Sequence, residues 1–241
     1  MTKNSETGFL LIHGLGSSHK STKTLADYLL EKGYLVDNID LPGHNTTPED
    51  LQRQEWKDWV DYAQKRLEKL QGKCERIYIS GISLGGCIAL YLGANNPNIS
   101  GLIICSTALE PVSFLTLILY HCSFIRYFVK WINVKKHFGK KLGLPESWET
   151  YEKLPISSVT NTAKLVKNLR KIVHNVSQPI IVIYSIHDKL VTLKGSQNIL
   201  NRVSSTDKQL LEIEKGGHAM LLDEGCNIAL EQISAWLENR L

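Results

Sequence analysis

Short apolar runs alternate with amphipathic stretches along most of the chain. About six runs have the length of a buried strand and are rich in β-branched and aromatic residues. The expected strands cover residues 8–13, 34–41, 76–80, 99–105, 179–185 and 209–213. Apolar residues at helical spacing predict helices over residues 21–32, 54–70, 84–94, 193–202 and 226–239. Strands that alternate with helices indicate an α/β fold with a mainly parallel, doubly wound sheet and right-handed crossovers.

The alternation is interrupted over residues 107–165, a stretch longer than a connecting helix needs. Its first half, residues 111–132, is very apolar, but charged residues interrupt it too often for a transmembrane helix. A basic cluster follows at residues 135–141. The stretch is either a helical insertion packed on the core with a solvated basic face, or a cap over an active site. In the second case its apolar face would hold acyl chains or make transient contact with a membrane surface. We therefore expect a core of residues 1–106 and 166–241 and a helical cap insertion of residues 107–165.

The most informative motif is Gly81-Ile82-Ser83-Leu84-Gly85, which lies between an expected strand and an expected helix. A sharp strand-to-helix turn leaves no room for side chains beside the turning residue, so glycines flank it. The turning residue is strained and presents its side chain at the edge of the sheet. The alternative without a catalytic role is a Gly/Ser turn that only joins the strand to the helix. The functional interpretation makes Ser83 a nucleophile.

Two later strand ends supply the partners that a serine nucleophile needs. A serine hydroxyl reacts only when a base accepts its proton and an acid orients that base. Asp188 follows the strand 179–185, and His218 follows the strand 209–213. Ser83, Asp188 and His218 therefore occur in the chain order expected for a nucleophile, acid and base on this kind of sheet. We predict that these three residues form a catalytic triad.

Other polar residues near these positions have simpler explanations. Asp223 is a rival for the triad acid, but its place before the last helix suggests a helix N-cap. His187, next to Asp188, points elsewhere if Asp188 faces the site. His13 and His44 lie in loops at strand ends, where each is expected to fix its loop by hydrogen bonds.

An acyl-transfer site also needs N–H donors for the negative charge that develops on the substrate oxygen. The N–H of Leu84, at the start of the elbow helix, is one candidate. The loop after the first strand supplies the other, because Gly14 allows the backbone to turn the N–H of Leu15 towards Ser83. We expect these two N–H groups to form the oxyanion hole.

Together these residues resemble the carboxylesterase and monoacylglycerol-lipase branch of the α/β-hydrolases, and most closely its compact bacterial carboxylesterases. The resemblance covers about residues 7–106 and 178–240. It rests on the motifs His13-Gly14-Leu15-Gly16, Asp40-Leu41-Pro42-Gly43-His44, Gly81-Ile82-Ser83-Leu84-Gly85-Gly86, His187-Asp188 and Gly216-Gly217-His218. One departure is Asn45, where relatives often have glycine; asparagine tolerates a left-handed backbone. The resemblance implies a serine carboxylester hydrolase that works through an acyl-enzyme, without a cofactor or a metal ion.

The apolar half of the insertion suggests the substrate. An acyl chain would be buried against Phe114, Leu115, Ile118 and Leu119, which favours medium-chain acyl esters or monoacylglycerols as small-molecule substrates. An acyl thioesterase would use the same triad and remains an alternative. A non-catalytic ligand-binding module on the same scaffold is a second one, although no triad residue is missing.

Charge and cysteine content bear on possible partners and on the cellular compartment. A formal net charge of +4 is too small to indicate nucleic-acid binding, and no nucleic-acid motif occurs. The five cysteines are scattered and lack C-x-x-C spacing, as is typical of buried thiols in a reducing compartment. The polar residues 1–7 do not resemble a signal peptide. We therefore expect a cytoplasmic protein.

Overall fold

A computed structural model describes residues 6–110, 130–134, 145 and 148–241 of the chain. Its main sheet has six strands in the order β2-β1-β3-β4-β7-β8, and each neighbouring pair is parallel. The strands are β1 (Thr7–Ile12), β2 (Leu35–Ile39), β3 (Arg76–Ile82), β4 (Gly101–Cys105), β7 (Ile180–Ser185) and β8 (Lys208–Ile213). The predicted parallel sheet of six strands is confirmed.

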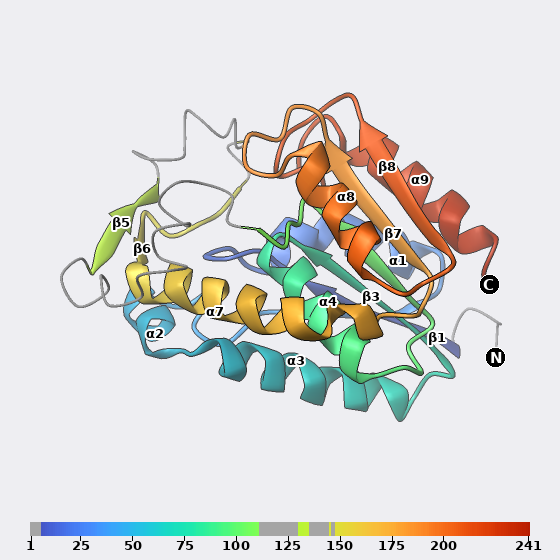
Figure 1. Ribbon diagram of the computed structural model, residues 1–241, viewed down its shortest axis with the longest axis horizontal. Helices are drawn as coiled ribbons and strands as arrows, with labels where there is room; N and C mark the ends of the chain where they lie inside the picture. The colour runs from blue at the N-terminus through green and yellow to red at the C-terminus, as the bar shows by residue number, and fades with distance from the viewer. Residues whose placement is uncertain (1–5, 111–129, 135–144, 146–147) are drawn as a thin grey trace.

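Helices cover both faces of this sheet, as a doubly wound fold requires (Figure 1). One face carries α1 (Lys23–Glu31), which follows the short 3-10 helix η2 (His19–Thr22), and α9 (Cys226–Glu238). The opposite face carries α3 (Trp56–Gln71), α4 (Leu84–Asn95), α7 (Ile156–Ile172) and α8 (Leu193–Arg202). The short helices α2 (Pro48–Arg53) and η5 (Val173–Asn175) pack against α7.

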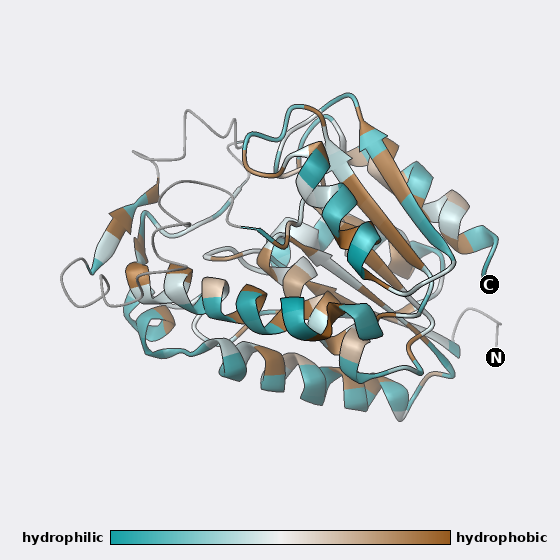
Figure 2. Cartoon of the chain, viewed as in Figure 1, coloured by the Kyte–Doolittle hydropathy of each residue, from teal (hydrophilic) through white to brown (hydrophobic). Residues whose placement is uncertain are grey.

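Alternate side chains of each central strand enter the two core layers. In β1, Leu10 and Ile12 pack towards α3 and α4, whereas Phe9 and Leu11 pack towards α1 and α9. All four are fully buried, and each such side chain stabilises the fold by about 1.5–3 kcal/mol. The central strands are therefore continuous apolar runs in the sequence, and they are visible as brown ribbons in Figure 2.

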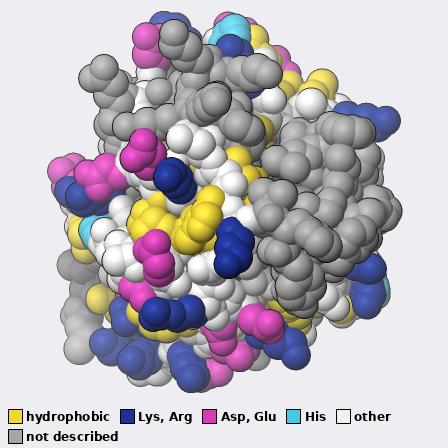
Figure 3. Space-filling model, turned by 90° about the vertical axis from the view of Figure 1, so that its left-hand side faces the viewer, with side chains coloured by type: hydrophobic (Ala, Val, Ile, Leu, Met, Phe, Trp, Pro, Cys, Tyr) yellow, Lys and Arg dark blue, Asp and Glu magenta, His cyan; other side chains and the backbone are white. Residues whose placement is uncertain are grey.

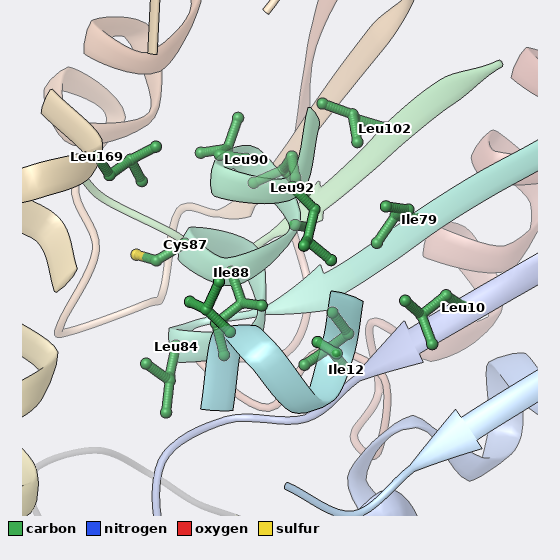
Figure 4. Packing of buried hydrophobic residues seen from close by; sticks show 14 of the residues in the cluster. Leu10, Ile12, Ile79, Leu84, Cys87, Ile88, Leu90, Leu92, Leu102 and Leu169 are labelled. Carbon is green, nitrogen blue, oxygen red and sulfur yellow. The ribbon is translucent and has the colours of Figure 1, made fainter. Parts of the chain in front are cut away.

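The elbow helix α4 is almost wholly buried, with apolar residues all round. Figure 4 shows Ile88 and Leu92 of α4 among the side chains of β1 and β3, with Leu169 of α7 on the other side. A helix packed between the sheet and a second helix has little freedom to shift, so the residue at its start is held firmly.

The strand order reverses between β1 and β3. The chain runs from β1 outward to β2, returns across β1 to β3, and then continues in the other direction. In open α/β sheets, ligands bind outside the carboxyl ends of the strands at such a switch point. Ser83 follows β3 there, and the loop from His13 to Gly16 follows β1.

The described part of the insertion lies at the end of the sheet towards which the strands point (Figure 1). It contains an antiparallel pair of short strands, β5 (Trp131–Asn133) and β6 (Lys153–Pro155). On this end of the molecule, described side chains of both charges surround a small hydrophobic group (Figure 3). The part of the chain that the structure describes contains no helix long and apolar enough to cross a membrane.

The expected boundary at residue 165 falls inside a single helix. α7 begins at Ile156, nine residues before that boundary, and packs on α3 and α4 with Leu165 and Leu169 in the main core layer. The first turns of α7 are rich in serine, threonine and asparagine, which are weak helix formers, so the sequence pattern did not indicate a helix there.

Candidate active site

The turn at Ser83 has the strained geometry that the motif predicts. Ser83 has φ 57° and ψ −114°, a conformation that non-glycine residues rarely adopt. A Cβ on Gly81 would overlap the backbone of Gly85, and a Cβ on Gly85 would overlap the carbonyl group of Ile12. The Ser83 N–H donates to the carbonyl oxygen of Cys105 at 3.0 Å, which ties the elbow to the end of β4.

Asp188 and His218 meet between the ends of β7 and β8. His218 Nδ1 lies 2.8 Å from Asp188 Oδ2, and both residues are buried. Asp188 Oδ1 accepts the N–H groups of Leu190, at 2.8 Å, and Val191, at 3.0 Å. Burial by itself would raise the pKa of Asp188, but the interactions with His218 and the two backbone donors outweigh burial and hold that pKa below its usual value. The carboxylate therefore stays ionised and orients the imidazole.

The loop after β1 lies directly against the elbow. A Cβ placed on Gly14 would be 3.5 Å from Cβ of Ser83 and 3.6 Å from the carbonyl oxygen of Ile82. Leu84 is the first residue of α4, so its N–H has no acceptor one turn earlier in the helix. Leu15 follows Gly14 in the contacting loop, and its side chain packs on the main core layer. The two predicted oxyanion donors thus belong to segments that touch each other beside Ser83.

Trp148, from the insertion, lies near both His218 and the loop that follows β1. Its ring centroid is 6.3 Å from that of His218, and its Cη2 atom lies 3.7 Å from the position that a Cβ on Gly14 would take. Trp148 could not be identified from the sequence, because a single tryptophan in an irregular stretch gives no periodic signal.

Further contacts fasten the described insertion to the loops at this edge. The Tyr151 hydroxyl donates to the Gly43 carbonyl oxygen at 2.8 Å and accepts the Thr46 N–H at 2.9 Å. The Leu154 side chain packs so closely on Gly16, which has φ 71°, that a Cβ there would collide with it. These residues were not identified from the sequence either. The predicted acyl-binding residues Phe114, Leu115, Ile118 and Leu119 lie outside the described residues.

His13 and His44 fix loops, as predicted. His13 Nε2 accepts the Leu41 N–H at 3.0 Å, and its Nδ1 donates to the Gly14 carbonyl oxygen at 2.7 Å. His44 packs beside His13 with ring centroids 4.8 Å apart, and its Nδ1 lies 3.2 Å from the Pro42 carbonyl oxygen. Burial lowers the pKa of His13 to about 4 and that of His44 to about 3. Both rings are therefore neutral near pH 7.

Asp40 organises the outer side of the same loops. Its carboxylate accepts the backbone N–H of His19 at 2.7 Å and contacts His19 Nδ1 at 2.8 Å and Asn45 Nδ2 at 3.0 Å. Asn45 has φ 55°, so the expected left-handed backbone at this departure from the family motif is confirmed. The role of His19 was missed because it lies 21 residues from Asp40.

The expectation that Asp223 caps the last helix is wrong. The residue at the N-cap position of α9 is Gly225, and the helix has no side-chain cap. The Asp223 carboxylate instead accepts the Gly217 N–H at 2.6 Å through Oδ2 and the Gly225 N–H at 2.9 Å through Oδ1. It therefore braces the loop that leads into His218. His187 is exposed at the surface, whereas the neighbouring Asp188 is buried.

Comparison with known proteins identifies the family of the chain. The family model described as serine aminopeptidase, S33, matches residues 4–225. The chain belongs to this family. It is 28% identical to a thermostable monoacylglycerol lipase of Bacillus sp. (strain H-257), over 92% of this chain and 86% of that protein. It is also 28% identical to a carboxylesterase of Bacillus subtilis (strain 168), over 98% of this chain and 94% of that protein.

A solved structure reported for the metagenome-derived lipolytic enzymes LipS and LipT has the same fold. Its TM-score is 0.88 at 23% identity, and the match covers 98% of this chain and 95% of that one. The α/β-hydrolase fold and the resemblance to the carboxylesterase and monoacylglycerol-lipase branch are confirmed. The protein is a serine hydrolase of this branch.

Proposed function

We propose that the protein hydrolyses carboxylic esters through a triad of Ser83, His218 and Asp188. The observation that carries the proposal is the 2.8 Å hydrogen bond between Asp188 and His218, at the same sheet edge as the strained elbow of Ser83. An ionised carboxylate fixes the imidazole with its proton on Nδ1, which leaves Nε2 free to act as a base. The names of the two Bacillus relatives support ester hydrolysis.

In this mechanism Ser83 Oγ attacks the ester carbonyl carbon while His218 Nε2 takes the hydroxyl proton. Asp188 stabilises the imidazolium that forms. The N–H groups of Leu15 and Leu84 donate to the oxyanion, and each such donor contributes about 3 kcal/mol. His218 then gives the proton to the departing alcohol oxygen, which leaves an acyl group on Ser83. A water molecule, deprotonated by His218, hydrolyses this acyl-enzyme and restores the serine.

For the substrate we propose medium-chain acyl esters or monoacylglycerols. The monoacylglycerol lipase among the relatives supports this class, as does the anchoring of the insertion at the site through Trp148 and Tyr151. The apolar residues proposed to hold the acyl chain are Phe114, Leu115, Ile118 and Leu119. A cytoplasmic location and a transient contact of the cap with a membrane surface complete the proposal. The four described cysteines are free and buried, as expected in a reducing compartment.

The test is covalent labelling with a fluorophosphonate followed by intact-mass and peptide analysis. We expect one adduct, on the peptide that contains Ser83, and none with Ser83→Ala. Asp188→Asn should lower kcat roughly 10³–10⁴-fold, because His218 would take the wrong tautomer. The matched control is Asp207→Asn, which changes a carboxylate paired with Arg240. An adduct elsewhere, or none on the folded protein, would refute the nucleophile. A parallel acyl-CoA assay separates thioesterase from esterase activity.

A further inference from the structure

The peptide bond between Gly216 and Gly217, just before His218, is held from both sides by side chains. Ser185, the last residue of β7, donates its hydroxyl hydrogen to the Gly216 carbonyl oxygen at 2.6 Å. Asp223 Oδ2 accepts the Gly217 N–H, also at 2.6 Å. The carbonyl group of Gly216 and the N–H of Gly217 belong to one peptide unit, which is trans, so they point in opposite directions. The two side chains therefore form hydrogen bonds to the same peptide plane from opposite sides.

The orientation of this peptide plane has to be restrained by hydrogen bonds because the plane lies between two glycines. A peptide unit flanked by residues without a Cβ rotates with little steric resistance. Gly216 has φ 76°, and a Cβ on it would overlap the Asp223 carboxylate. Glycine is thus required for the close approach of Asp223, and it also removes the steric barrier that would otherwise fix the plane. Hydrogen bonds have to supply the missing restraint.

The hydrogen bonds of Ser185 also connect the loop that carries Asp188 with the loop that carries His218. The Ser185 carbonyl oxygen accepts the Asp188 N–H at 3.0 Å, and Ser185 Oγ accepts the His187 N–H at 3.1 Å. Ser185 therefore holds the loop of Asp188 and the loop of His218 at once. Asp223 fixes the latter loop from the far side through Gly217 and Gly225.

We infer that Ser185 and Asp223 are positioning residues for His218: together they lock the Gly216–Gly217 peptide plane and thereby place the imidazole on Asp188. The inference rests on the proposed function, because it assigns His218 as the base. It does not make either residue a group that touches the substrate.

The experiment compares Ser185→Ala, Asp223→Asn and the double variant with matched controls. Asn at position 223 would set an NH₂ group against one of the two N–H donors. Ser205→Ala removes a buried serine hydroxyl that likewise donates to a carbonyl oxygen, that of Asp207, at 3.0 Å. Asp207→Asn removes a carboxylate that pairs with Arg240. Urea unfolding places the variants and controls on one stability scale.

We expect each site variant to lower kcat/KM for a p-nitrophenyl ester about tenfold through kcat, with KM unchanged. The double variant should lose more than the product of the single effects, because either bond alone still opposes rotation of the same plane. The controls should lose stability but keep kcat. Site variants whose kcat stays within about twofold of the controls at equal stability would overturn the inference. If Asp223→Asn does not fold, Ser185→Ala and Ser185→Cys carry the same comparison.

A second readout does not depend on ester hydrolysis. The Nδ1 hydrogen of His218, bonded to Asp188, should give a downfield proton NMR signal, assigned by its loss in His218→Gln. The signal should persist in the controls and disappear or broaden in the double variant. A signal unchanged in the double variant would overturn the inference even if the enzyme is active. A wild-type protein that shows the signal but neither hydrolyses esters nor labels at Ser83 would refute the proposed function and leave the positioning intact.

Discussion

The indole of Trp148 lies beside the imidazole of His218, with ring centroids 6.3 Å apart and planes inclined by 52°. The same indole reaches the turn at Gly14. Trp148 therefore spans the space between the proposed base, which protonates the departing alcohol, and the loop proposed to bind the oxyanion. A large apolar surface in this place would contact the alcohol part of an ester.

We predict that Trp148→Ala reduces the difference in kcat/KM between esters of large alcohols and esters of small alcohols. With one acyl group throughout, kcat/KM for a benzyl ester should fall about tenfold, and that for a methyl ester much less, because only the larger alcohol loses apolar contact. Trp148→Phe should keep most of the preference. The control is Trp56→Ala, since Trp56 of α3 packs on Tyr91 of α4. Equal losses on both esters would show that Trp148 supports the loop rather than the substrate.

The buried histidines predict how stability depends on pH. In the unfolded chain His13 and His44 bind protons near pH 6.5, whereas in the fold their pKa values are about 4 and about 3. The unfolded state therefore binds more protons below pH 6.5, and the free energy of unfolding falls as pH decreases from about 6.5 to about 4. Each ring contributes a slope of up to about 1.4 kcal/mol per pH unit.

Urea unfolding between pH 7 and pH 4.5 checks this expectation. His44→Gln keeps a donor for the Pro42 carbonyl oxygen but does not titrate, so it should lower the slope of stability against pH by about half. His174→Gln, at an exposed position, serves as the control. A wild-type stability that stays constant down to pH 5 would contradict the assignment of neutral, buried rings.

The third prediction concerns acyl length. Each methylene buried against the apolar insertion should gain about 0.8 kcal/mol, nearly fourfold in affinity. Catalytic efficiency should therefore rise from acetyl to roughly octanoyl esters and then level off as the pocket ends. Replacing Leu115 and Leu119 by serine should flatten this rise and leave acetyl-ester turnover nearly intact. Leu30→Ser, at an exposed position of α1, is the control. A wild-type enzyme fastest on acetyl esters would refute an acyl pocket in the insertion.

Local sequence determined the sheet, five of the helices that pack on it and the strained elbow. The central strands are buried on both faces, so their apolar runs are unbroken. Gly81 is required by its contact with Gly85 inside the turn, whereas Gly85 is required by the backbone of Ile12 and His13 at the end of the neighbouring strand β1. The strand ends at Asp188 and His218 could likewise be located from the sequence. Helix α7 could not, because its early residues are weak helix formers and its burial depends on α3 and α4.

Tertiary structure alone decided which polar groups meet. Asp223 had two possible roles in the sequence, as triad acid or helix cap, and its contacts with the N–H groups of Gly217 and Gly225 give it a third. Trp148 and Tyr151 reach the site from an irregular stretch that lacks any period. The sequence by itself thus determined the elements whose burial pattern repeats along the chain. Pairings across long separations required the fold, because hydrogen bonds between loops depend on distance in space and leave no periodic trace in the sequence.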